Sequence, residues 1–250
     1  MVVQVVEAFY RQKGDGEYSG RFSAKPYWST FGDSVLWDHH RRPHEMTVAV
    51  TTADGKSAVF EQIRRFAATP GPAVLILGAH GGKATSTGPH SGRYLHFPGA
   101  KGEAGGKVSW AQLREWFGQP TDSLQKAVIF DACSFCRDGK EVKSFGKSTG
   151  LGLIVGYSKD IPVFDSLLFH LAFVSYLLFH WGLKGSRGYE PEHLASQNPL
   201  ADFGERYGTL AQFLGMRVFQ NKAGKCNDIT KSILPNRAEP SESTGLEGDA

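Results

Sequence analysis

Two side chains suited to nucleophilic chemistry each follow an apolar run. The run 73–77 leads to His80, and the run 127–130 leads to Cys133. If these runs are neighbouring parallel strands, the imidazole and the thiol meet at one edge of the sheet, where the imidazole can take the thiol proton and later protonate a leaving amine. Gly81 has no Cβ, so a substrate carbonyl can approach its amide, which with the Cys133 amide would form an oxyanion hole. The pattern predicts Cys133 as nucleophile and His80 as general base.

Strands and helices must alternate along the chain to place these two residues together. Apolar or β-branched runs predict strands at 2–9, 47–51, 73–77, 127–130 and 151–155. Apolar residues at helical spacing predict helices at 57–67, with Ser57 as a cap, at 109–117 and at 164–181. The alternation predicts the α/β class: three layers, with a mostly parallel sheet flanked by helices and the run 73–77 at its centre.

The length of 250 residues suits one folded domain, which we place at residues 1–220. Within it, apolar spacing predicts a helix over 199–214 and a last edge strand at 216–219. Beyond these, the chain becomes polar and rich in Ser, Glu, Pro and Gly, which cannot bury enough apolar area to offset the entropy of ordering. We therefore expect a disordered tail at 221–250.

Composition narrows the class of protein. The net charge of +3 is spread along the chain, so no nucleic-acid surface is implied. Three cysteines, with no leader-like segment at the start, favour the cytoplasm. The apolar stretch 161–183 contains Asp165, His170 and His180, so we expect a buried core helix and no membrane span, with both histidines bonded to backbone.

These motifs resemble the caspase-hemoglobinase fold of cysteine peptidases, which includes caspases, metacaspases and their short bacterial relatives. The matching pieces are an apolar strand before His80-Gly81 and another before Asp131-Ala132-Cys133, together with the strand and loop 154–166. The separation of 53 residues between the histidine and the cysteine is similar to caspase spacing. The resemblance covers roughly residues 1–185. It implies a cysteine endopeptidase that needs no cofactor and acts on a protein or peptide substrate.

The resemblance also implies a specificity pocket. Metacaspases place an aspartate two residues before the nucleophile, and Asp131 stands there. Glu7 would add a carboxylate on the same rim, and Ser158, Asp160 and Asp165 lie in the segment that lines the pocket in caspase-like enzymes. Asp165 fits equally well as a first-turn residue that compensates the helix dipole. Two carboxylates favour cleavage after Arg or Lys.

Several alternatives stay open. A caspase-like domain can act as a silent binding or regulatory scaffold, or as a peptidase that awaits an activating partner, as in bacterial defence systems that cleave gasdermins.

Cys133 and Cys136 form a C-x-x-C pair typical of redox or zinc sites, but no second ligand pair stands at zinc spacing, so we expect no metal. Caspases and metacaspases usually have a small residue and then glycine after the cysteine, and the segment Ser134-Phe135-Cys136 departs from that pattern. The basic segment 137–147 fits either a processing loop or a solvated connection.

Overall fold

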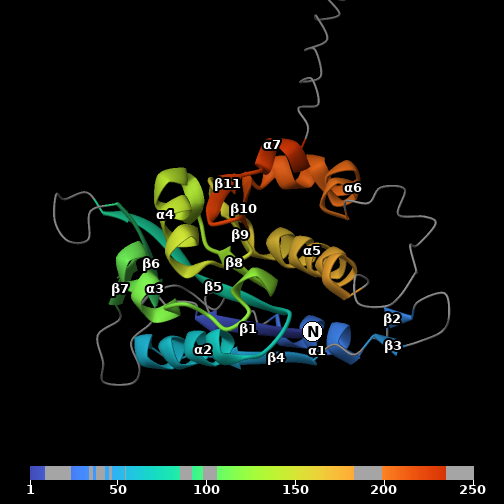
Figure 1. Cartoon of the computed structure of the whole chain (residues 1–250), viewed down its shortest axis with the longest axis horizontal. Helices are drawn as coiled ribbons and strands as arrows, with labels where there is room; N and C mark the ends of the chain where they lie inside the picture. Colours follow the sequence, from blue (N-terminus) through green and yellow to red (C-terminus); the bar gives the residue numbers. More distant parts are fainter. Residues whose placement is uncertain are drawn as a thin grey trace, which may run out of the picture.

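A mixed, mostly parallel sheet forms the centre of the protein (Figure 1). The computed structural model describes residues 1–8, 24–33, 36–37, 43–44, 47–53, 55–84, 92–97, 106–182 and 199–234. The main path of the sheet has the strand order β11-β10-β9-β8-β5-β1-β4, and β6 and β7 extend it from β5. The predicted α/β class, with a mostly parallel sheet flanked by helices, is confirmed.

The strands of this sheet are β1 (Val2–Ala8), β4 (Thr47–Thr52), β5 (Ala73–Ala84), β6 (Gly92–Phe97), β7 (Gly106–Ser109), β8 (Lys126–Asp131), β9 (Leu153–Tyr157), β10 (Met216–Lys222) and β11 (Lys225–Asp228). A separate pair is formed by β2 (Leu36–Trp37) and β3 (Pro43–His44). The helices are α1 (Lys25–Asp33), α2 (Lys56–Ala68), α3 (Trp110–Phe117), α4 (Gly139–Thr149), α5 (Val163–Gly182), α6 (Pro199–Phe213) and α7 (Thr230–Ile233). Two short 3-10 helices are η1 (Ser123–Gln125) and η2 (Phe135–Arg137).

Strand β5 is central, as predicted from its continuous apolar run. It pairs in parallel with β1 on one side and with β8 on the other. Beyond Ala79 the same strand continues as an antiparallel partner of β6. The two strands that carry the histidine and the cysteine motifs are therefore neighbours.

Helices cover both faces of the sheet, which gives three layers (Figure 1). On one face, Leu75, Leu77 and Phe130 pack in a core with α2, α3 and α4. On the other, Ile76 and Ile129 pack in a core with α1, α5, α6 and α7. Side chains of a strand alternate between its faces, so each buried strand contributes to both cores.

Local sequence signals account for some helix starts and not for others. Helix α3 begins with the predicted capping box, in which the Ser109 hydroxyl accepts from the Gln112 amide and the Gln112 side chain accepts from the Ser109 amide. Helix α2 differs from the prediction, because Ser57 lies inside it. The N-cap is Gly55, whose φ of 98° suits a residue without a Cβ.

Three predictions for the later part of the chain need correction. The basic segment 137–147 is not a loop: most of it forms α4, which the Asp138 carboxylate caps by accepting from the Lys140 amide. Strand β10 is not an edge strand, because β11 pairs with its outer side. Ordered structure also continues past residue 220 through β11 and α7, beyond the predicted domain boundary. Residues 235–250 lie outside the described residues.

The apolar stretch 161–183 contributes the 20-residue helix α5, which contacts α6. Among the described residues, no helix combines the length and hydropathy required to cross a membrane. Phe169, Phe173 and Leu177 are buried in the core beneath the sheet. The prediction of a core helix is confirmed.

Candidate active site

The strand register brings the predicted histidine and cysteine to the same rim. Gly78 of β5 pairs with Asp131 at the end of β8. His80 and Cys133 each lie two residues further along the chain, His80 within β5 and Cys133 in the turn after β8, at the carboxyl end of the parallel part of the sheet. His80 is exposed, and Cys133 is half-buried. Both residues therefore stand at the edge where α/β proteins bind their ligands.

Gly81, the residue after the histidine, lies in direct contact with the backbone of Cys133. A Cβ added at Gly81 would lie 1.9 Å from the carbonyl oxygen of Cys133 and 3.1 Å from its backbone nitrogen. Strand β5 therefore passes directly against the Cys133 backbone, and the two amides assigned to an oxyanion hole belong to touching residues. The glycine is needed here for the approach of the Cys133 backbone, a physical reason different from the access to substrate that we predicted.

The loop after β9 holds the residue that follows the cysteine. Ser134 has a left-handed φ of 53°, which is uncommon for a residue with a side chain. Its amide donates to the Lys159 carbonyl at 2.8 Å, and its hydroxyl donates to an Asp160 carboxylate oxygen at 3.0 Å. The Ile161 amide donates to Cys133 Sγ at 3.5 Å. The predicted pocket segment thus contacts the cysteine loop, and Asp160 is the acidic residue that reaches it.

The surroundings of Cys133 disfavour the thiolate form of its side chain. Burial raises the pKa of this thiol above its ordinary value, and the carboxylates of Asp160 and Asp131 raise it further, while the Ile161 amide opposes them. A resting thiolate is therefore disfavoured. In this environment a general base such as His80 would have to remove the proton as the nucleophile attacks.

The raised pKa predicts a pH dependence of thiol alkylation. Because only the thiolate reacts, alkylation of Cys133 by iodoacetamide should be slow at pH 7 and should still be increasing above pH ~8.5, the usual thiol value. The rate should be followed by mass spectrometry, with Cys133→Ala as the control for the other cysteines. A half-maximal rate near pH 6 would instead indicate a preformed imidazolium–thiolate pair.

A small cavity lies next to the candidate pair of His80 and Cys133, on the face of the sheet that α1 and α5 cover. Glu7, Gly78 and Asp131 are register partners on three adjacent strands, and all three line the cavity. Its volume is about 20 Å³, enough for roughly one water molecule. Because Gly78 has no side chain, the two carboxylate residues face the space between their strands. The predicted juxtaposition of Glu7 and Asp131 is therefore present in the fold.

Both acidic side chains already have partners inside the protein. A Glu7 carboxylate oxygen accepts from the Ala24 amide at 2.5 Å, beside α1. Asp131 accepts from the Ser166 side chain, and its Oδ2 lies 3.9 Å from Nδ1 of His170. Burial raises the pKa of the Asp131 carboxyl, and the His170 charge and the Ser166 hydrogen bond oppose the rise.

His170 was predicted only as a core residue, but the structure also places it next to Asp131 at this cavity. It is buried as expected, but it bonds to a side chain instead of the backbone: its Nε2 lies 2.6 Å from the Tyr157 hydroxyl. Burial lowers the pKa of the imidazole, and Asp131 opposes this shift. No local motif could have linked Asp131, Tyr157 and His170, because they come from β8, β9 and α5.

Two other predicted pocket residues are not brought to the cysteine. The Ser158 hydroxyl donates to the Gly215 carbonyl at 2.9 Å, so it ties β9 to the start of β10. Asp165 lies in the first turn of α5, and its carboxylate makes no hydrogen bond or ion pair with the described residues. The placement fits the alternative in which Asp165 compensates the helix dipole.

The C-x-x-C pair is split between two environments. Cys136 is fully buried, and a Cβ added at Gly156 would lie 2.3 Å from its sulfur. Burial raises the pKa of the Cys136 thiol, and it also raises the pKa of Cys226, to about 11. All three cysteines are free thiols. Within the described ranges, no group of three or more potential ligands is placed to hold a metal ion.

Comparison with solved structures finds proteins of similar fold. No protein-family model matches the chain, and no curated protein matches it. The crystal structure of protein GSU0716 from Geobacter sulfurreducens is similar over 91% of this chain and 92% of its own, with 10% sequence identity and a TM-score of 0.41.

Proposed function

We propose that this protein is a cysteine endopeptidase of the caspase-hemoglobinase fold, with Cys133 as nucleophile and His80 as general base. The observation that carries the proposal is the contact of Gly81 with the Cys133 backbone. That contact sets the histidine-bearing strand against the cysteine loop, at the ligand-binding end of a mostly parallel sheet. The amides of Gly81 and Cys133 would stabilise the oxyanion formed when the thiolate attacks a peptide carbonyl.

The same enzyme would prefer a basic residue before the scissile bond. Asp131 and Glu7 line one cavity beside the dyad, and a guanidinium or ammonium group could pair with either carboxylate. A cavity of about 20 Å³ cannot hold such a side chain, so substrate binding would require its wall to move. Ala24 and Trp28 of the α1 region form part of that wall, which makes α1 the element to be displaced.

Profiling with a fluorogenic peptide library varied at the residue before the scissile bond tests this function. The wild-type protein should cleave after Arg or Lys, and Cys133→Ala should be inactive. Cleavage after Asp would support the peptidase activity but contradict the proposal that an acidic pocket selects a basic residue. If no peptide is cleaved even with reductant and calcium present, the peptidase proposal fails for the isolated protein. A silent scaffold, or a peptidase that stays inactive until a partner or signal arrives and then cleaves a protein such as a bacterial gasdermin, would then be favoured.

Replacing Asp131 by asparagine tests the pocket separately from the dyad. Loss of a charge-assisted pair costs about 1.5–3 kcal/mol, so kcat/KM for Arg and Lys peptides should fall about tenfold or more relative to peptides with a neutral residue. Asp165→Asn is the matched control, because it removes the same charge from a residue outside the cavity. An unchanged preference in Asp131→Asn would exclude this carboxylate from the pocket.

A further inference from the structure

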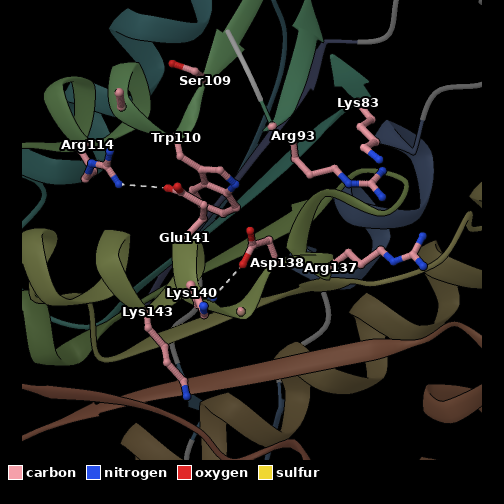
Figure 2. A pocket seen from close by; sticks show the side chains of 13 residues that line it. Lys83, Arg93, Ser109, Trp110, Arg114, Arg137, Asp138, Lys140, Glu141 and Lys143 are labelled. Carbon is pink, nitrogen blue, oxygen red and sulfur yellow. Dashed lines mark hydrogen bonds and ion pairs between the residues drawn. The ribbon is translucent and has the colours of Figure 1, made fainter. Parts of the chain in front are cut away.

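A second, much larger cavity lies apart from the acidic one. It has a volume of about 860 Å³, within the size range of small-molecule sites. Its walls come from strands β5 and β6, from α3 and from the start of α4 (Figure 2). Six cationic side chains line it: Lys83, Arg93, Arg114, Arg137, Lys140 and Lys143.

The two acidic side chains of the cavity, Asp138 and Glu141, offset only part of this positive charge. Glu141 pairs with Arg114 at 3.3 Å. Asp138 is engaged as the N-cap of α4. In the described part of the chain, no acidic group is paired with Lys83, Arg93 or Arg137. The cavity therefore keeps an excess of positive charge.

The strand register places two of these cations directly opposite each other. Lys83 of β5 pairs with Arg93 of β6 in an antiparallel ladder. Like charges at such positions repel and destabilise the pairing. In Figure 2 both side chains extend to the same side of the cavity, as does Arg137 from the turn below them. A multivalent anion between them would replace this repulsion with attraction.

Two further donors stand at the same walls. Helix α4 has 11 residues, and its first residue, Gly139, lines the cavity, so the positive end of the helix dipole lies there. The indole Nε1 of Trp110 is buried and has no hydrogen-bond partner within the described structure. Figure 2 shows this nitrogen on the Arg93 side of the ring. These donors favour a ligand rich in acceptor oxygens.

We propose that this cavity binds a small molecule that carries several phosphate groups. Arginine side chains match phosphate oxygens with paired N–H donors, and lysines add point charges. A terminal phosphate carries about −1.5 to −2 charges and three acceptor oxygens, so two or three phosphates balance the unpaired cations better than carboxylates can. The site is independent of the peptidase chemistry, because none of its lining residues belongs to the dyad or the acidic cavity.

Titration calorimetry on the full chain tests the proposal with sodium tripolyphosphate as the probe. One molecule should bind per chain, more tightly than citrate, and affinity should weaken as salt is raised. Arg93→Gln and Arg137→Gln should each weaken binding about tenfold or more, because each removes a charged fork from the site. Lys147→Gln removes the same charge from α4 outside the cavity and should change affinity less than about twofold.

Thermal unfolding gives a second readout that does not depend on fitting a binding curve. Without ligand, Lys83→Gln should unfold at the same or a higher temperature than wild type, because the repulsion with Arg93 is removed. With tripolyphosphate, its gain in unfolding temperature should be smaller than that of wild type. The phosphate site would be overturned if tripolyphosphate showed no saturable binding, or if citrate or an acidic peptide bound as tightly or more tightly. It would also be overturned if Lys147→Gln weakened tripolyphosphate binding as much as the two arginine variants do.

Discussion

Cys133→Ala should lower kcat/KM for peptide cleavage by about 10³-fold or more while leaving the fold intact, because it removes the proposed nucleophile from a half-buried rim position. The second cysteine of the C-x-x-C pair should behave in the opposite way. Cys136→Ala should keep kcat/KM within a few-fold of wild type, because its sulfur is buried against Gly156. It should instead cost about 1–2 kcal/mol of stability through the cavity left behind.

Steady-state kinetics and denaturant unfolding of both variants measure these two effects. His80→Ala should share the kinetic loss of Cys133→Ala, and a double variant should lose no more than either single one, because the two groups act as a unit. Comparable loss of activity in a stably folded Cys136→Ala would contradict the assignment of Cys133 as the nucleophile.

Gly81→Ala should have the second largest effect. A Cβ at this position would lie 1.9 Å from a backbone oxygen of Cys133, well inside the ordinary contact range of 3.4–4 Å. Backbone cannot rotate away as a side chain can, so the cysteine loop must shift. A displacement of about 1 Å at a catalytic group can cost about 100-fold in rate, and overpacking adds about 1–3 kcal/mol of destabilisation.

The neighbouring glycine provides a matched control. A Cβ at Gly82 would lie 2.5 Å from the ring of Tyr94, which is a side chain and can move. Gly82→Ala should therefore retain most of the activity, although it adds the same methyl group one residue away. Kinetics should be compared at equal folded fractions. If Gly81→Ala were as active as Gly82→Ala, the close approach of β5 to Cys133 would have no part in catalysis.

The strands that carry the candidate dyad were predictable because buried parallel strands have a strong local signature. Residues covered on both faces must be apolar without alternation, and the runs 73–77 and 127–130 satisfy this. Since parallel strands end at one edge of the sheet, the residues that follow them are brought near each other. The capping box of α3 could also be predicted from a local pattern, because both of its partners lie within four residues of each other.

Other features had no such local signal. Helix α4 follows the candidate nucleophile closely, and its basic sequence 137–147 was equally typical of a solvated connection. The last strands were misjudged because polar residues dominate β11, which has β10 as its one partner among the described strands. A strand of this kind is specified by its partner more than by its own composition.

The sequence by itself determined the class of fold and the two strand ends at which His80 and Cys133 stand, with the small residues around them. These features depend on burial and on near neighbours in the chain, so a local pattern is enough to predict them. Only the tertiary structure decided that Gly81 touches the Cys133 backbone, that a buried histidine stands beside Asp131, and that cations from distant segments surround one cavity. Such contacts join segments tens of residues apart, and their geometry is set by strand register and helix packing, which no local pattern encodes.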